Sequence, residues 1–287
     1  MSLFKDYYQL LKPGIVRGNL ITAVAGYLLA SKGNVDVSRL LPVLAGFYLT
    51  LGSSCVLNNV IDIDIDSKMH RTKDRALVKG TITVKQALIY SAALMIIGTA
   101  LLYFYGSVAA IIAGFIGWIF YIVIYSKFTK RQTVLGTLAG SVSGAMPPVA
   151  GYLAVGSSLD IGVILIFLSL VFWQMPHFFA IAIMQQKDYS EAGIQVMSVV
   201  YGIAKTRQLA VSYILGFGLV MTSLYLYGYC GIIFLITMLI LTTLWLIYAL
   251  KPVNTKNQLK WGLKVFRTSL LVLLMWSLLL SIENYLN

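Results

Sequence analysis

Nine long apolar runs dominate this 287-residue sequence and restrict what it can fold into. They lie near residues 14–30, 40–60, 86–105, 108–125, 134–155, 161–184, 207–227, 230–250 and 266–285. A helix needs about 20 consecutive apolar residues to cross a bilayer core, and these runs are of that order. They lack the alternation of membrane barrel strands, and a helix satisfies its own backbone groups in lipid. We therefore predict an all-α, polytopic membrane protein with nine transmembrane helices, forming one membrane domain over residues 1–287.

Charged residues are few and unevenly placed. They make up 11% of the chain, whereas a soluble domain carries about 25%. With the N-terminus in the cytoplasm, all but two of the 22 Lys and Arg residues fall on the cytoplasmic side, the exceptions being Lys32 and Arg39. This bias follows the positive-inside rule, so the net charge of +12 indicates topology and not nucleic-acid binding. Nothing before the first span resembles a signal peptide or a mitochondrial presequence, which favours a bacterial cytoplasmic membrane.

An acidic cluster follows the second apolar run. Asn58, Asp62 and Asp66 are spaced four residues apart, so on a helix they share one face, while Asp64 points roughly the other way. Carboxylates near hydrocarbon cost about 2.5–3.5 kcal/mol and need partners. All-oxygen ligands suit Mg²⁺, which keeps waters and shares phosphate oxygens. The alternative is that the acids pair with nearby cations in a solvated loop. For three residues on one face, we favour the interpretation as a metal–diphosphate site.

Cations follow the acids and recur on the next inner loop. Arg71 and Arg75 are four residues apart, so a continuing helix would direct both to one site, where guanidinium groups match phosphate oxygens in pairs. Tyr125, Lys130 and Arg131 lie at the end of the fourth span. Inner loops also collect Lys and Arg for topology alone. Arg71 and Arg75 are the stronger candidates because the acids stand beside them.

The sixth span contains a proline followed by a histidine. Pro176 cannot donate to the carbonyl of Phe172, so we expect the helix to bend or partly unwind there, next to a cavity. His177 would lie at that break. The alternative role for a lone histidine in an apolar span is a hydrogen bond to a neighbouring carbonyl. In the following loop, Lys187 and Asp188 are candidates for the same site or for solvation of the loop.

These stretches resemble a known family. The pattern N-N-x-x-D-x-D-x-D with R-T-x-x-R after it is similar to the first acidic motif of the UbiA-type intramembrane prenyltransferases. Further stretches resemble the haem-farnesylating branch of that family: KPGIVRGNLIT at 12–22, YSKFTKR at 125–131, GSVSGAMPPVAGY at 140–152 and WQMPHFFAIAI at 173–183. The likeness extends from Lys12 to the last span.

The resemblance implies a nine-helix bundle around a central cavity and a set of residue roles. Asn58, Asp62 and Asp66 would be the catalytic residues that hold Mg²⁺. The diphosphate would be bound by Arg71, Arg75, Tyr125, Lys130 and Arg131. Many family members carry a second aspartate-rich motif after the sixth span. This chain has His177 and Lys187 there, with Asp188 as the nearby acid, so Lys187 and Asp188 are candidates for that motif and His177 for haem contact, including as an axial ligand.

The implied reaction transfers a farnesyl group from farnesyl diphosphate to a vinyl group of haem B, and water completes the product, haem O. Mg²⁺ and the guanidinium groups would neutralise the charge that develops on the diphosphate. Aromatic faces could stabilise the allylic cation, with Trp118, Tyr121, Phe172 and Trp173 as candidates. The resemblance also implies partners for the protein. These are the lipid bilayer around it and either haem A synthase or the assembly of a terminal oxidase.

Three other functions could use the same residues. A sibling enzyme would prenylate an aromatic ring, and it should show acids where this chain has Pro176, His177 and Ile183. A transporter would use Asp62 and Asp66 as coupling-ion sites, but these acids follow a span and do not lie midway along one. A non-catalytic assembly factor for an oxidase would leave the polar face without a purpose.

Overall fold

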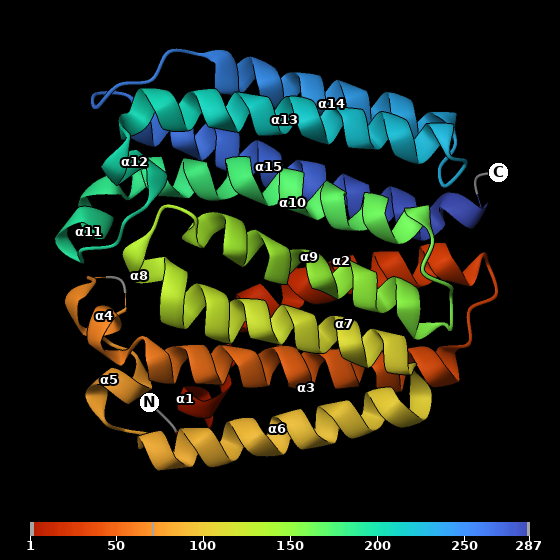
Figure 1. Ribbon diagram of the computed structural model, residues 1–287, viewed down its shortest axis with the longest axis horizontal. Helices are drawn as coiled ribbons and strands as arrows, with labels where there is room; N and C mark the ends of the chain where they lie inside the picture. Colours follow the sequence, from red (N-terminus) through yellow and green to blue (C-terminus); the bar gives the residue numbers. More distant parts are fainter. Residues whose placement is uncertain (1–2, 71, 286–287) are drawn as a thin grey trace.

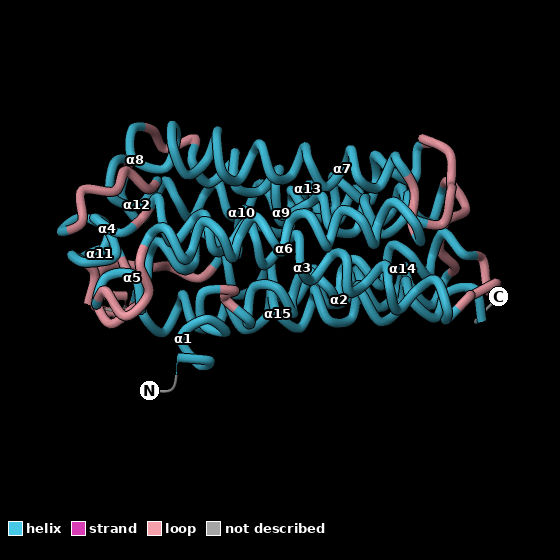
Figure 2. Tube along the Cα trace, turned by 90° about the horizontal axis from the view of Figure 1, so that it is seen from below, coloured by secondary structure: helices cyan, strands magenta, loops and turns pink. Residues whose placement is uncertain are grey.

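Long helices build the fold, as seen in a computed structural model that describes residues 3–70 and 72–285, except the side chain of residue 131. No strand occurs within these ranges. The described residues form nine long helical segments, which lie side by side (Figures 1 and 2). They are α2 (Pro13–Ser31), α3 (Val37–Ile61), α6 (Val84–Tyr105), α7 (Val108–Trp118) continued by η1 (Ile119–Thr129), α9 (Gly136–Ala154), α10 (Ile161–Met184), α13 (Gly202–Leu226), α14 (Ile232–Leu250) and α15 (Gln258–Ile282).

The predicted all-α membrane fold is confirmed. Eight of these described segments are long and apolar enough to cross a membrane. The ninth long helix is α9, which carries many Gly, Ser and Pro residues and is largely buried among its neighbours. Two helices begin earlier than predicted, α13 at Gly202 and α15 at Gln258, because both extend into polar sequence beyond their apolar runs.

Short helices gather at one end of the bundle, which we call the polar end (Figure 1). They are α1 (Leu3–Leu10), α4 (Ile63–Lys68), α5 (Ala76–Lys79), α8 (Lys130–Gln132), α11 (Gln186–Glu191) and α12 (Met197–Val200). At the opposite end the connections are shorter, and Asp36, Ser107 and Asp160 cap α3, α7 and α10 by accepting from backbone N–H groups. The last turn, η2 (Glu283–Tyr285), also lies there. The polar loops therefore share one end, as the sequence predicts.

The helix α10 occupies the middle of the bundle, with α13, α14 and α15 on one side and α9, α7, α3 and α6 on the other (Figure 1). Trp245, Trp276 and Phe217 are almost completely buried between α13, α14 and α15. The helix α10 remains continuous through Pro176, so the predicted possibility of partial unwinding is wrong. Proline removes one intrahelical hydrogen bond, whereas unwinding in an apolar bundle would leave several backbone groups unsatisfied.

The helices α2 and α9 approach each other through two glycines. A Cβ atom on Gly26 would lie 2.0 Å from the carbonyl oxygen of Pro148, and one on Gly151 would lie 2.0 Å from the carbonyl oxygen of Ala23. Only glycine permits backbones this close, as in the small-residue contacts of membrane helices. We call this contact the α2–α9 seam; other residues of both helices line the cavity described below.

Candidate active site

A cavity of about 670 Å³ lies inside the bundle and reaches the polar end. Its lining comes from α2, α3, α6, α7, η1, α9, α10 and α15 and from the short helices and loops of the polar end. Asn58, Asp62 and Asp66 all line it and are 2%, 1% and 5% exposed. Asp64 is exposed. The prediction that three polar side chains share one face and Asp64 faces away is confirmed.

The chain stays close to helical through this motif. Helix α3 ends at Ile61, and α4 resumes at Ile63, with Asp62 between them at φ −93° and ψ 6°. The i→i−4 bonds continue across this junction, from Asp62 N to Asn58 O at 3.0 Å and from Asp66 N to Asp62 O at 2.8 Å. This continuity keeps the three side chains in register.

Each motif side chain contacts a cation from another part of the chain. Lys130 Nζ lies 2.5 Å from Asp62 Oδ2, and Arg75 forms an ion pair with Asp66. The Lys12 ammonium donates to the amide oxygen of Asn58. The alternative, in which these acids pair with nearby cations, is therefore observed for Asp66 and Arg75. Asp62 Oδ1 is nevertheless buried with no hydrogen-bond partner among the described residues.

A π-helix places the fourth span against the acids. In η1 the backbone bonds follow the i→i−5 pattern, as from Lys130 N to Tyr125 O. Ser126 Oγ donates to Tyr121 O at 2.7 Å and accepts from Asn58 Nδ2 at 2.8 Å. Because the hydroxyl has one proton and gives it to Tyr121, the Asn58 amide nitrogen must face Ser126. The Asn58 oxygen is thereby directed to Lys12.

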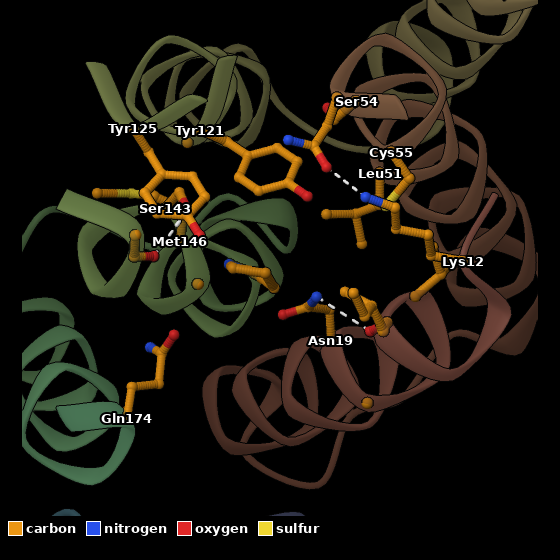
Figure 3. A pocket seen from close by; sticks show the side chains of 18 of the residues that line it. Lys12, Asn19, Leu51, Ser54, Cys55, Tyr121, Tyr125, Ser143, Met146 and Gln174 are labelled. Atoms are coloured by element: carbon orange, nitrogen blue, oxygen red, sulfur yellow. Dashed lines mark hydrogen bonds between the residues drawn. The ribbon is translucent and has the colours of Figure 1, made fainter. Parts of the chain in front are cut away.

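Two tyrosines of η1 point into the cavity, across it from Lys12 (Figure 3). The rings of Tyr121 and Tyr125 are stacked, with centroids 5.9 Å apart and planes 10° apart. The Lys130 ammonium lies 5.8 Å from the centroid of Tyr125, within cation–π range. The structure therefore brings Tyr125 and Lys130 to the acids, as the sequence predicts.

Lys12 is a site residue that the sequence did not single out. It has a left-handed backbone (φ 51°, ψ 64°) directly before Pro13, a conformation that costs a non-glycine residue about 1–3 kcal/mol. Asn59 supports this turn, since its Nδ2 donates to Leu10 O at 2.8 Å. Burial of the ammonium group lowers the pKa of Lys12 to about 8. A lysine directly before a proline at the start of a span was the available signal.

His177 borders the same cavity from α10. It lies seven positions before the end of α10, roughly 10 Å along the helix axis from the polar end. Its ring is stacked on Trp173, with centroids 4.8 Å apart, and packs on Phe266 at 4.7 Å. The partner of its Nδ1 is the hydroxyl of Ser269 at 2.7 Å, not a backbone carbonyl.

Other candidates lie elsewhere. Lys187 is exposed, 3.8 Å from Glu191, and neither it nor Asp188 is among the described residues that line the cavity. Phe172 packs on Tyr213 and also lies away from the lining, whereas Trp118, Tyr121 and Trp173 line it. Arg71 and the side chain of Arg131 lie outside the described residues.

Similar proteins define the class of this chain. Residues 19–278 match the model of the UbiA prenyltransferase family, and the chain belongs to that family. It is accordingly a transferase and a multi-pass membrane protein. Within the family it is 41% identical to protoheme IX farnesyltransferase of Aliivibrio salmonicida, over 98% of this chain and 97% of the relative. The protein of the same name from Yersinia pseudotuberculosis is 43% identical, over 98% of this chain and 95% of the relative.

Solved structures share the fold. A structure described in connection with digeranylgeranylglyceryl phosphate synthase superposes with a TM-score of 0.80 at 22% identity, covering 98% of this chain and 99% of the other. A UbiA homologue from Archaeoglobus fulgidus, bound to GPP and Mg²⁺, gives a TM-score of 0.67 at 17% identity, covering 96% and 99%. These likenesses establish the helical architecture.

Proposed function

We propose that this protein transfers a farnesyl group from farnesyl diphosphate to a vinyl group of haem B and that water completes the product. The observation that carries the proposal is the pair of buried carboxylates, Asp62 and Asp66, contacted by cations inside a deep and mostly apolar cavity. Relatives named protoheme IX farnesyltransferase, at 41–43% identity over nearly the whole chain, support the choice of substrates.

Asp62, Asp66 and the Asn58 oxygen would hold Mg²⁺. The donor set fits, because all three supply oxygen and Asp62 Oδ1 is buried without a partner among the described residues. No three described His, Cys, Asp or Glu side chains are grouped closely enough to hold a metal ion by themselves. Oxygens of the diphosphate and of water would therefore complete the coordination. When bound, Mg²⁺ supplies positive charge that stabilises the departing diphosphate.

Lys12, Arg75 and Lys130 would bind the diphosphate. Each of them contacts one side chain of the acidic motif. With the motif side chains turned to a metal ion, these three cations would be available to phosphate oxygens, to which they would donate charge-assisted hydrogen bonds. The site thereby exchanges internal ion pairs for contacts to metal and substrate without leaving a buried charge unpaired.

The cavity would hold the farnesyl chain and limit access of water. Each buried methylene contributes about 0.8 kcal/mol, so apolar walls bind the chain along its length. The allylic C–O bond breaks with its electron pair on the diphosphate, and the vinyl π electrons form the new C–C bond. The resulting cation takes hydroxide from water, and a proton leaves to solvent. Trp118, Tyr121 and Trp173 line the cavity where their faces can stabilise the allylic cation.

His177 is our candidate for haem contact, with its ring between Trp173 and Phe266 at the cavity wall. Imidazole is a common partner of haem iron, and aromatic neighbours suit a flat macrocycle. We further infer that residues 1–287 act as one domain, because the lining extends from Lys12 to Leu273. We place the polar end in the cytoplasm of a bacterial cell, on the positive-inside bias of the sequence. Contact with haem A synthase or with terminal oxidase assembly remains part of the proposal.

Membranes containing the protein test this function directly. We expect incubation with haem B, farnesyl diphosphate and Mg²⁺ to yield haem O, detected by chromatography. Folded protein that forms no such product would refute the assignment, and transfer to an aromatic ring would favour the sibling enzyme. Loss of haem binding in His177→Ala, with farnesyl diphosphate affinity intact, would support the haem role; loss of folded protein would assign His177 to structure alone.

A further inference from the structure

Ser269 of α15 lies at the centre of three hydrogen bonds beside the cavity. Its hydroxyl oxygen is 2.6 Å from the carbonyl oxygen of Phe266 and 2.7 Å from His177 Nδ1. Its carbonyl oxygen accepts from Trp173 Nε1 at 2.7 Å. Ser269 is completely buried, so no water competes for these contacts. Helices α10 and α15 are thus joined around the residue that we assign to haem contact.

The hydroxyl proton has only one favourable place. Two oxygens 2.6 Å apart need a proton between them, and the Phe266 carbonyl has none to give. Ser269 therefore donates to Phe266, and its lone pair faces His177. The Nδ1 of His177 must then carry a proton and donate to Ser269. The neutral ring has one N–H group, so Nε2 keeps a free lone pair.

The surroundings hold this arrangement in place. The His177 ring packs on the rings of Trp173 and Phe266, whose planes lie at 24° and 32° to it. A flip of the ring would replace Nδ1 by a carbon atom and leave the Ser269 lone pair unsatisfied. Within the described part of the chain, Nε2 has no hydrogen-bond partner, and the His177 ring borders the cavity.

We propose that Ser269 is a positioning residue that fixes His177 as the Nδ1–H tautomer, leaving Nε2 as a ligand for the iron of a haem in the cavity. The haem part of this inference rests on the proposed function, whereas the tautomer does not. The opposite tautomer would present an N–H group to the cavity and could not bind iron. Outer hydrogen bonds commonly orient metal-binding histidines in this way, and their loss weakens metal affinity by about 10–100-fold.

The chain suits a direct measurement, because it has only two histidines. A His70→Gln variant, changed at an exposed residue, leaves His177 as the single histidine. Protein labelled with ¹⁵N-histidine in lipid should show a protonated Nδ1 and an unprotonated Nε2 by solid-state NMR. Ser269→Ala should shift the His177 ring toward the Nε2–H form. Ser269→Thr keeps the hydroxyl and should therefore keep the Nδ1–H form. A protonated Nε2 in the protein with Ser269 intact would overturn the proposal.

Haem titration supplies the second measurement. We expect Ser269→Ala to weaken haem B binding about 10–100-fold and to leave farnesyl diphosphate affinity unchanged. The matched control is Ser281→Ala on the same helix, since Ser281 Oγ donates to Ser277 O at 2.7 Å and orients no ring. Equal weakening by both variants would overturn the positioning role. If the tautomer is as stated but haem B does not bind through His177, the haem assignment fails while the tautomer stands.

Discussion

The ammonium of Lys130 lies 2.5 Å from the carboxylate of Asp62, although the two residues are 68 positions apart in the sequence. Both side chains are mostly withdrawn from solvent, at 17% and 2% exposure. The contact joins the end of the π-helix to the end of α3 at the cavity. The acid proposed to hold metal therefore has a counter-charge within the protein itself.

Removal of the Asp62 charge should impair catalysis strongly. We expect Asp62→Asn to lower turnover by about 10²–10³-fold, because the metal proposed to stabilise the leaving diphosphate would lose a charged ligand. Asp74→Asn is the control: the side chains of Asp74 and Lys79 form an ion pair that is exposed (69% and 47%), so the change should have little effect on stability and leave turnover intact. Product formation in membranes measures turnover. Unimpaired Asp62→Asn would contradict the role of this acid.

Mg²⁺ and farnesyl diphosphate should bind interdependently. Without diphosphate oxygens, Asp62 and Asp66 offer an incomplete shell and are already paired with cations. We expect a non-ionisable farnesyl diphosphate analogue to raise Mg²⁺ affinity at least about tenfold, a coupling of about 1.4 kcal/mol. Titration calorimetry with and without the analogue measures this coupling. Equal Mg²⁺ affinity in both titrations would count against shared coordination.

The affinity for farnesyl diphosphate should fall as the pH rises through about 8. Burial lowers the pKa of Lys12 to about 8, so above this pH the free site loses one cation. Lys12→Arg should retain affinity at higher pH, because guanidinium stays charged. Lys12→Met should bind weakly at every pH. Binding measured across pH 6.5–9.5, about 1.5 units on either side of that pKa, tests the three proteins together.

Titration of Lys12 would not lower the affinity for farnesyl diphosphate by unfolding the protein. The pKa of Lys12 is lower in the folded protein than the ordinary value of 10.5. Between about 8 and 10.5 the unfolded chain therefore holds the additional proton, and this group makes the free energy of unfolding increase with pH. A fall in stability that parallels the fall in affinity would point to another titrating group.

The α2–α9 seam should tolerate no side chain. Gly151→Ala would place a Cβ atom 2.0 Å from the Ala23 carbonyl oxygen, and we expect a loss of at least about 1–3 kcal/mol in stability. Gly18 on α2 has open space where a Cβ atom would lie, so Gly18→Ala serves as the control. We expect its stability to be unchanged or slightly increased. Thermal unfolding in detergent compares the two variants. Similar melting temperatures would disprove the close approach.

Local sequence pattern was sufficient for the helices and for the acidic motif. Apolar length determines the spans, and the spacing of Asn58, Asp62 and Asp66 determines their shared face, because both follow from helix geometry. The π-helix, by contrast, leaves no spacing signature in residues 119–129, since its wider turns depend on side-chain bonds such as Ser126 to Tyr121. Contacts between helices on opposite sides of the bundle could not be predicted from local sequence pattern either.

Lys12 and Pro176 illustrate the two kinds of failure. Lys12 reaches the site through a contact with Asn58, 46 residues away, which no local pattern encodes. Pro176 has a strong local preference against helix, yet α10 continues because its neighbours enclose it on both sides. In the first case the decisive partner is distant in sequence. In the second, packing in an apolar medium outweighs local propensity.

The glycine contacts between α2 and α9 have a consequence for how the helix bundle can change shape. At Gly26 and Gly151 the two backbones already touch, so neither helix can slide inward, and separating them would open a gap that lipid chains cannot fill well. At its far end α2 is also held by Asn284, whose Nδ2 donates to Leu28 O at 3.0 Å. The spacing between these two helices is therefore fixed at this contact. Any widening of the bundle has to come from helices other than this pair.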